Sequence, residues 1–417
     1  YKGDQFALLT SAKCTNEDNY IAQKFARVVM ETNNIDSQCR LYDAPTIAGL
    51  HEVTGIGAMT NPIDELELDD IRLTIGPNIT QTHPVAGLKV KRAVRNGAKL
   101  IIVNPREIDL CRFPNIWLRP YPGTDVALLM GMAKVIVDEG LLDAAFVEER
   151  CDNFGEFRKS LDDFSLGRVE RITGVSREVI AEAARIYASN KPAAILWSAG
   201  ITQYSHGTDN VLALTNLAML TGNIGEPSSG LYPLWRQNNA HGTCDMGCLP
   251  NFYPGYQMVA SLEVQRKFES AWNVKLNPKP GLALTEIPQA VLDGRIKTLY
   301  IIGANPVVTM PASEKAQQAL EKAEFVIVQY IFLNETAKFA DVVLPAASFA
   351  EKDGTFTNTE RRVQRVHQAI ELIGNSRPDW QIICQLAKRL DCEGFDFGSP
   401  EEIMSEIAAL TPIYGGI

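Results

Sequence analysis

Residues 340–365, ADVVLPAASFAEKDGTFTNTERRVQR, hold the densest group of side chains suited to binding a polar ligand. The β-branched run at 340–344, which ends at Pro345, predicts a buried strand that leads into a loop. The segment from Lys352 to Arg362 is rich in hydroxyl, amide and charged groups. Ligands of open α/β sheets bind beyond the carboxyl ends of strands, so such a loop suits a large phosphate-bearing ligand. An ordinary solvated loop has a similar composition, and the residues alone leave both interpretations open.

This segment resembles the one by which molybdopterin oxidoreductases (the dimethyl sulfoxide reductase family) hold a pyranopterin guanine dinucleotide. Two further stretches agree with the family in order: SAKCTNEDNYIAQKFARVVMETNNID at 11–36 and QNNAHGTCDMG at 237–247. The formate dehydrogenase catalytic subunit is the branch that the chain resembles most. The resemblance implies a bis-molybdopterin guanine dinucleotide cofactor carrying molybdenum or tungsten.

Formate dehydrogenases place a metal-ligating cysteine or selenocysteine, followed by a histidine, in the segment that resembles CRLYDAPTIAGL at 39–50. The resemblance aligns Tyr42 and Asp43 with these two positions. A phenol has a pKa of about 10 and is neither soft nor ionised near neutral pH. Tyr42 or Asp43 is therefore a candidate metal ligand, and the alternative is that neither touches a metal.

The arginine that binds formate in the family lies two residues before Gln237, where this chain has Trp235. Arg236 lies one position later and is the remaining candidate for the substrate side. The alternative for Arg236 is a surface or intersubunit charge. The resemblance thus implies a catalytic set of Tyr42, Asp43 and Arg236.

Polar turns follow several predicted strands, including those at 73–78 and 100–105. Glycine in such turns lets the backbone approach phosphate groups, and an aspartate such as Asp125 can accept from a guanine edge. The alternative for Asp125 is a plain helix N-cap. The cofactor-binding residues that the resemblance implies here are Gly76, Asn78, Thr82, Asn104, Arg106, Gly123, Asp125, Gly200 and Gln203.

A second set of candidates comes from the C-terminal half. Tyr330 occupies a position where the family usually has an aspartate that helps to hold a guanine, which puts one nucleotide site in doubt. The remaining cofactor-binding candidates are Gln237, Asn238, Asn239, Gly242, Asp245, Gly303, Asn305, Gln329, Glu335, Thr336, Thr357, Asn358 and Arg361.

Short apolar strands alternate with helices along the chain, which predicts an α/β fold with mainly parallel sheets. By resemblance there are two nested, doubly wound domains with the cofactor cleft between them. Residues 1–38 and 238–391 form the first, discontinuous domain, and residues 39–237 form the inserted second domain. Residues 392–417 are expected to be a C-terminal extension.

Composition excludes several classes of protein. The net charge of −10 argues against nucleic-acid binding, and no apolar run is long enough for a membrane span. The eight cysteines are dispersed without a CxxC pair, which predicts a reducing, cytoplasmic location and no iron–sulfur cluster in this chain. Cys244 and Cys248 are the most closely spaced and are interpreted as pterin-loop residues.

These observations predict a molybdopterin-dependent subunit that transfers two electrons at molybdenum or tungsten, with a substrate other than formate. The expected partners are an iron–sulfur domain or subunit, a C-terminal domain that completes the cofactor cleft, and redox partner subunits. The alternative is a non-catalytic structural or electron-transfer subunit of a larger redox complex, for which the NADH dehydrogenases offer a family precedent.

Overall fold

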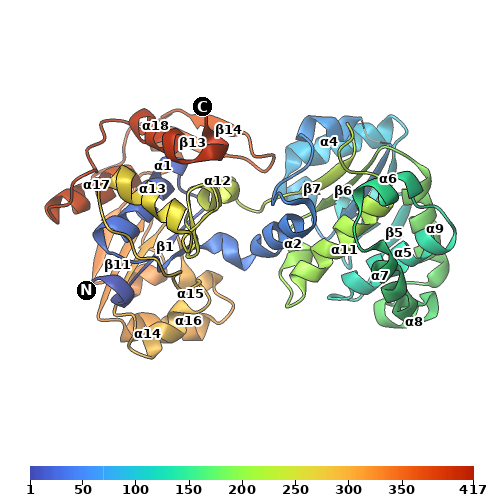
Figure 1. Ribbon diagram of the computed structural model, residues 1–417, viewed down its shortest axis with the longest axis horizontal. Coiled ribbons are helices and arrows are strands. Elements are labelled where there is room, and N and C mark those ends of the chain that lie inside the picture. The colour runs from blue at the N-terminus through green and yellow to red at the C-terminus, as the bar shows by residue number, and fades with distance from the viewer. Residues whose placement is uncertain (69) are drawn as a thin grey trace. The chain divides into compact units, whose positions relative to one another are not determined.

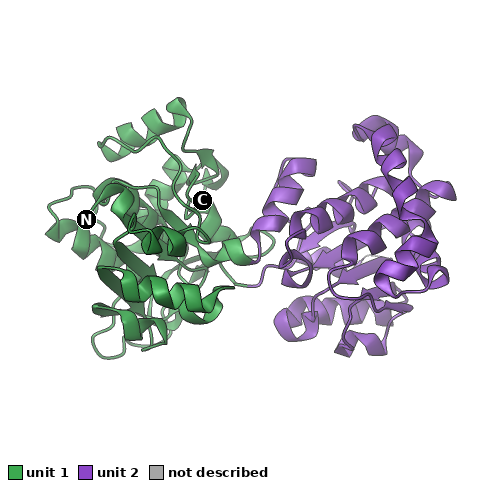
Figure 2. Cartoon of the chain, turned by 90° about the horizontal axis from the view of Figure 1, so that it is seen from below, with its two compact units in different colours: residues 1–41, 237–417 green, residues 42–236 purple. Residues whose placement is uncertain are grey.

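The computed structural model describes residues 1–68 and 70–417, which form two compact units (Figure 2). Unit 1 comprises Tyr1–Leu41 and Gln237–Ile417, and unit 2 comprises Tyr42–Arg236. Both chain ends therefore lie in unit 1. Residues 392–417, expected as an extension, also belong to unit 1, where Phe395, Ile403 and Ile407 are buried in its core.

Unit 1 is built on a five-stranded parallel sheet in the order β12-β11-β10-β1-β2. Figure 1 labels two of its strands, β1 and β11. Successive residues of β1 point to opposite faces: Phe6 and Leu8 enter one apolar core, and Ala7 and Leu9 enter another. Both faces of the central strands are thus covered, which explains the continuous apolar runs in the sequence. The strands are β1 (Phe6–Thr10), β2 (Ile35–Ser37), β10 (Thr298–Ile302), β11 (Phe325–Tyr330) and β12 (Val342–Pro345).

Helices cover both faces of this sheet. On one face lie α1 (Asn16–Lys24), α13 (Leu262–Trp272), α17 (Asp379–Arg389) and α18 (Pro400–Leu410). On the other lie α14 (Ile287–Leu292), α15 (Pro306–Thr309) and α16 (Ser313–Lys322). The unit also contains α12 (Ala240–Asp245) and the short strand pair β8 (Phe252–Tyr253) and β9 (Gln257–Met258).

Unit 2 repeats this plan with a parallel sheet in the order β5-β4-β3-β6-β7. Its strands are β3 (Ile71–Ile75), β4 (Lys99–Val103), β5 (Ile116–Leu118), β6 (Ala193–Trp197) and β7 (Gly230–Pro233). Its helices are α2 (Ala44–Thr54), α3 (Ile79–Thr82), α4 (Pro84–Arg95), α5 (Asp125–Asp138), α6 (Ala144–Arg150), α7 (Phe154–Ser160), α8 (Leu166–Thr173), α9 (Arg177–Ser189), α10 (Ala199–Thr202) and α11 (Gly207–Leu220). The predicted α/β fold class with mainly parallel sheets is confirmed.

The segment from 340 to 365 differs from the expectation in two ways. Strand β12 lies at the edge of the sheet and is partly exposed, so the prediction of a buried strand was wrong. The polar residues after it are also not an open loop. They form an antiparallel hairpin of β13 (Gly354–Thr357) and β14 (Val363–Val366). Thr355, Phe356 and Thr357 and the valines at 363 and 366 are residues that favour strands, but the hydroxyl content of the segment masked this signal.

None of the helices in the two described ranges combines the length and apolarity needed to cross a membrane.

Arg27 ties the first helical segment of unit 1 to a distant part of the chain. Its guanidinium is fully buried and donates to the carbonyl oxygens of Gly247 (3.1 Å), Leu249 (2.9 Å) and Phe252 (2.7 Å). Burial lowers the pKa of Arg27 to about 10, so the group stays protonated near neutral pH. One side chain therefore satisfies three backbone carbonyls of the turn that follows α12.

We predict that Arg27→Met lowers the free energy of unfolding of the chain by about 3–5 kcal/mol, because three carbonyl oxygens lose their charged donor inside the core. Chemical denaturation followed by circular dichroism measures the change. The control is Arg266→Met, an exposed arginine on α13, for which the change stays within about 0.5 kcal/mol. Equal losses in both variants would contradict a structural role for the Arg27 hydrogen bonds.

Candidate functional site

The candidate residues of unit 2 gather at the carboxyl edge of its parallel sheet. Gly76, Asn78 and Thr82 follow β3, and Asn104 and Arg106 follow β4. The others follow the remaining strands: Gly123 and Asp125 after β5, Gly200 and Gln203 after β6, and Trp235 and Arg236 after β7. The fold thus brings turns that are up to 160 residues apart in sequence to one edge of a sheet, the place where open α/β folds bind ligands.

Gly76 and Gly200 mark the point where the strand order of this sheet reverses. The chain runs from β3 to β4 and β5 on one side, and β6 and β7 lie on the other. A Cβ atom on Gly200 would lie 2.6 Å from the Gly76 carbonyl oxygen, and Gly76 has a φ of 84°. Both positions therefore need glycine, since the two turns pack backbone against backbone at the reversal.

Hydrogen bonds within this edge fix the turns. Asn104 donates from Nδ2 to the Gly76 carbonyl oxygen (3.2 Å) and accepts at Oδ1 from the Arg106 amide (3.0 Å). Asp125 is the first residue of α5, and Thr124 occupies the N-cap position, so the expected alternative of Asp125 as N-cap is corrected. Burial raises the pKa of Asp125.

Tyr42 and Asp43 are both buried in unit 2 and lie directly before α2. The Tyr42 carbonyl oxygen accepts from Thr202 Oγ1 (2.5 Å), and the guanidinium carbon of Arg236 lies 6.0 Å from the centre of the Tyr42 ring. Trp235 is buried, and its carbonyl oxygen lies 2.9 Å from His83 Nε2. The structure therefore places Tyr42 and Arg236, two of the three catalytic candidates, beside one another.

Cys39 lies three residues before Tyr42 in the sequence. It lies in unit 1, is buried, and its thiol donates to the carbonyl oxygen of Ala240 at 3.7 Å.

A cavity of about 460 Å³ opens at the carboxyl edge of the unit 1 sheet. The order of that sheet reverses between β1 and β10, and the cavity is lined by residues that follow both strands, including Lys13, Cys14 and Gly303. A Cβ atom on Gly303 would lie 2.8 Å from Cys14 Sγ, and Gly303 has a φ of 64°, so this position needs glycine. The other lining residues are Asn238, Gln329, Tyr330, Ile331, Ala346, Ala347, Ser348, Phe349, Lys352, Phe356 and Asp379.

A buried lysine that lines the cavity joins two buried carboxylates. Lys352 Nζ lies 2.6 Å from Asp18 Oδ2 and 2.5 Å from Asp379 Oδ2, and all three side chains are almost inaccessible. Burial alone would lower the pKa of Lys352, but the charges of Asp18 and Asp379 outweigh it and the pKa stands above its usual value. We call these residues the lysine triad. It joins α1, the segment after β12 and the start of α17.

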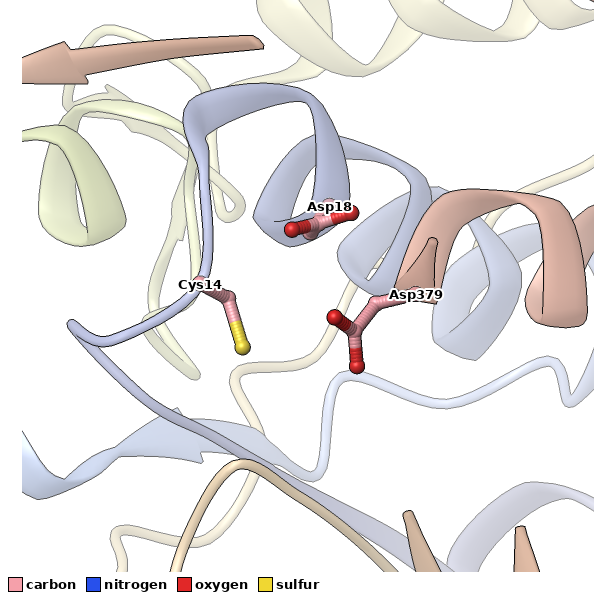
Figure 3. Close-up of side chains that lie close together, drawn as sticks. All are labelled: Cys14, Asp18 and Asp379. Atoms are coloured by element: carbon pink, nitrogen blue, oxygen red, sulfur yellow. The ribbon is translucent and has the colours of Figure 1, made fainter. Parts of the chain in front are cut away.

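Cys14, Asp18 and Asp379 converge closely enough to resemble a metal site (Figure 3). Two observations oppose that interpretation. The ammonium of Lys352 already bonds to both carboxylates, where a cation would sit. Burial also raises the pKa of the Cys14 thiol well above its usual value, whereas metals bind the thiolate. The cluster is better explained as an internal ion triad with a neutral thiol beside it.

Several candidates in unit 1 hold the β13–β14 hairpin in place. Thr357 donates its amide to Asn239 Oδ1 (2.8 Å) and shares a hydrogen bond with the Tyr414 hydroxyl (2.5 Å). Tyr414 also donates to Asp245 Oδ2 (3.1 Å), and Arg361 pairs with Asp245 at 3.3 Å. These side chains bond to one another, which indicates that they position the loop at 358–362.

The other unit 1 candidates bond to one another, pack within their own segments or line the cavity. Asn305, Glu335 and Thr336 bond to one another: Asn305 Nδ2 donates to Glu335 Oε2 (2.7 Å), and Thr336 Oγ1 donates to Asn305 Oδ1 (2.7 Å). Asn358 Oδ1 accepts from backbone amides of its own turn. Gly242 packs against the side chains of Asn16 and Asn239, where a Cβ atom would overlap them. Of all these candidates, Asn238, Gly303 and Gln329 line the cavity. Gln237 is the residue directly before Asn238.

Lys13, Cys14 and Asp379 were not among the predicted binding residues, and Lys352 was named only as part of the polar segment 352–362. Lys13 and Cys14 follow β1 and lie in the stretch at 11–36 that resembles the family, a position that could have identified them. The partnership of Lys352 with Asp18 and Asp379 spans more than 300 residues of sequence, and no local pattern signals it.

Glu17 of α1 also holds the β13–β14 hairpin in place, through two hydrogen bonds to Thr355. Its Oε2 accepts from the Thr355 amide (2.8 Å), and its Oε1 accepts from Thr355 Oγ1 (2.9 Å). Burial raises the pKa of Glu17 to about 7, although the two Thr355 hydrogen bonds act to lower it. A carboxyl group that titrates near neutral pH thus lies at the base of the hairpin.

Comparison with known proteins agrees with this geometry. The family model of the molybdopterin oxidoreductases matches residues 1–389. The chain belongs to the molybdopterin oxidoreductase family, whose members bind a molybdopterin cofactor with molybdenum or tungsten. The family resemblance stated from the sequence is confirmed.

Individual relatives narrow the similarity to the formate dehydrogenase type. The chain is 45% identical over 416 residues to the F420-dependent formate dehydrogenase subunit alpha of Methanocaldococcus jannaschii, covering 99% of this chain and 61% of that protein. It is 42% identical over 402 residues to formate dehydrogenase H of Escherichia coli, covering 96% of this chain and 56% of that protein. The chain thus spans about three fifths of the length of these curated relatives.

Acetylene hydratase from Pelobacter acetylenicus has a similar structure, with a TM-score of 0.77 and 22% sequence identity, covering 98% of this chain and 58% of that one. At this identity the likeness supports the fold alone.

We predict that Glu17→Gln changes how the stability of the chain depends on pH. The pKa of Glu17 is about 7 in the folded chain and 4.5 without its surroundings, so the folded state binds the proton more tightly. The stability that Glu17 contributes is therefore fully present below about pH 4.5 and is lost as the pH rises through about 7. The substituted amide stays neutral throughout, so the variant gains about 3 kcal/mol relative to the wild type across this window.

Denaturation curves at about pH 5, 6, 7 and 8 measure this difference. Glu314→Gln, which removes an exposed carboxylate from α16, controls for the loss of one negative charge. A constant difference between wild type and Glu17→Gln across the series would contradict the prediction.

Proposed function

We propose that the chain is the cofactor-binding part of a bis-molybdopterin guanine dinucleotide oxidoreductase, with one dinucleotide held at the carboxyl edge of each unit. The single observation that carries this proposal is the repeated geometry. Each unit has a five-stranded parallel sheet whose order reverses, and candidate glycines follow strands at that reversal: Gly76 and Gly200 in unit 2 and Gly303 in unit 1. The 460 Å³ cavity of unit 1 is also within the usual range of about 300–1,000 Å³ for small-molecule sites.

Specific residues of each unit are suited to the dinucleotides. In unit 2 the glycine turns at Gly76 and Gly200 expose backbone to phosphate groups, and Gly123 precedes the N-terminus of α5. In unit 1 Lys13 supplies a cation at the cavity, while Gly303 leaves room for a ring system. The bound cofactor supplies the two-electron redox chemistry, and the chain supplies position, charge and exclusion of water.

We propose a substrate other than formate. Tyr42, Asp43 and Trp235 occupy the positions of the family's thiolate or selenolate, histidine and formate-binding arginine. Formate needs a cation to seat its carboxylate, and a buried indole carries none. Arg236 is exposed and lies near the Tyr42 ring, so it is the cation available to a different anionic substrate.

The replacement at position 42 also favours a second candidate function. The donor set at residues 42–43 is a phenol and a carboxylate, without the soft ligand of the formate dehydrogenases. A non-catalytic structural or electron-transfer subunit of a larger redox complex, as in the NADH dehydrogenases, would keep the fold and lose that ligand. Metal content separates the two candidates.

The partners are part of the same proposal. Relatives carry names as alpha subunits, and this chain spans about three fifths of their length. We infer an iron–sulfur domain or subunit, a C-terminal domain that completes the cleft, and redox partner subunits. We also propose that this chain itself holds no iron–sulfur cluster and that the protein is cytoplasmic, both on the ground of its dispersed, free cysteines.

We predict that the protein, purified with any flanking domains, contains molybdenum or tungsten near one atom per chain and does not oxidise formate. Inductively coupled plasma mass spectrometry gives the metal content, and dye-linked formate oxidation gives the activity. Metal far below one atom per chain would favour the non-catalytic subunit.

The triple variant Tyr42→Cys, Asp43→His, Trp235→Arg tests the substrate argument. Formate oxidation should rise above background in it, because a soft ligand and a carboxylate-binding cation are restored. Formate turnover by the wild type that survives Tyr42→Phe and is abolished by Arg236→Ala would contradict the proposal, since Arg236 would then seat the carboxylate.

A further inference from the structure

A second cavity lies within unit 2, at the edge of the sheet opposite to the candidate site. It has a volume of about 280 Å³ and is lined by residues of α6, α7, the connection between them and the end of α11. Helix α11 ends at Leu220, shortly before Asn223, whose Oδ1 accepts from the amide of Ala193, the first residue of β6 (3.0 Å). The cavity therefore lies near the amino ends of the strands, whereas the proposed cofactor site lies at their carboxyl ends.

The apolar part of the lining contains two aromatic rings. Val147 and Leu220 are buried, Met219 is half-buried, and Phe154 and Phe157 of α7 contribute the rings. The volume is just below the range of about 300–1,000 Å³ that is usual for small-molecule sites. Hard metal ions take oxygen ligands, so an apolar, aromatic lining suits a small organic molecule better than a bare metal ion.

The polar part of the lining consists of two carboxylates and two amides: Asp152, Asn153, Glu156 and Asn216. In the described part of the chain, their side chains make no hydrogen bond or ion pair with another protein group. Ionised carboxylates accept hydrogen bonds and do not donate, and amide oxygens also accept. None of the described residues that line the cavity is positively charged, and Arg150, at the end of α6, is outside the lining. A positively charged ligand with N–H donors therefore matches this set.

We propose that this cavity is a binding site for a small organic diammonium ion. One ammonium group pairs with Asp152 and the other with Glu156, while the alkyl chain between them packs on the apolar lining. The rings of Phe154 and Phe157 add cation–π attraction, which is the usual way in which proteins recognise organic ammonium groups. The site is separate from the proposed cofactor site and does not depend on it.

The test compares two molecules with the same four-carbon chain. Putrescine carries an ammonium group at each end, and butane-1,4-diol carries a neutral hydroxyl group at each end. Isothermal titration calorimetry of the 417-residue chain at about pH 7.5 and 50 mM salt, where exposed charges are little screened, gives both dissociation constants. The wild type should bind putrescine at least about tenfold more tightly than the diol, as expected for hydrogen bonds to charged groups.

Three variants locate the binding. Asp152→Asn and Glu156→Gln should each weaken putrescine binding about tenfold, because each removes one charged acceptor. Phe154→Leu should weaken it about threefold and leave the diol unaffected, because the ring attracts only the cation. The matched control is Glu149→Gln: it removes an exposed carboxylate of α6 that does not line the cavity, so the affinity stays within about twofold.

Three results would overturn the inference. The first is no measurable binding of putrescine by the wild type, and the second is equal binding of putrescine and the diol. The third is equal weakening by Glu149→Gln and Glu156→Gln, which would show that putrescine is attracted to the acidic surface as a whole. Each would leave the proposed function untouched, since that function rests on the carboxyl edges of the sheets. Thermal unfolding without ligand shows whether the variants fold equally well, and the wild-type comparison is decisive even if one of them does not.

Discussion

The cavity edge of unit 1 depends on one buried ammonium. Lys352 holds Asp18 of α1 and Asp379 of α17 together, and three segments that are distant in sequence meet at its Nζ atom. Removing one partner of such a buried ion group leaves an uncompensated charge, which typically costs about 3–5 kcal/mol. The loops around the cavity are therefore fixed by charge as well as by packing.

Polar side chains at this edge divide into those that face the cavity and those that hold the loops. Asn239, Asp245 and Thr357 are buried and bond to other protein groups, and Tyr414 joins two of them. A buried polar group without a partner is costly, so these residues had to form a closed network once the hairpin packed against α12. The hydrogen bonds that hold the loops explain why these residues are polar. A role of the same residues in cofactor binding remains a prediction.

The two units have different residue types at the point where the strand order of the sheet reverses. Unit 2 uses glycine at the strand reversal, where Gly76 and Gly200 pack backbone against backbone. Unit 1 uses charged and amide side chains at the same topological place. Both units have functional candidates at this place because all strands of a parallel sheet end at the same edge. The reversal of strand order then leaves a gap between neighbouring loops. Family membership, with 45% identity to a formate dehydrogenase subunit, agrees with this plan. Tyr42 and Trp235 are the residues on which the proposal of a different substrate rests.

The sequence by itself determined the family, the α/β class and the strand ends at which candidate residues stand, because apolar runs followed by polar turns are local patterns. It failed at β12 and at the β13–β14 hairpin, since edge position and pairing depend on neighbours that composition does not specify. Only the tertiary structure decided which polar residues face the cavity. Lys352 and Asp379 became part of its wall through contacts with Asp18 and Gln329, residues 334 and 50 positions away. Contacts between residues so far apart leave no periodic pattern in the sequence, whereas strand ends do. For this reason the edge of the sheet could be predicted, and the place of Asp379 in the cavity wall could not.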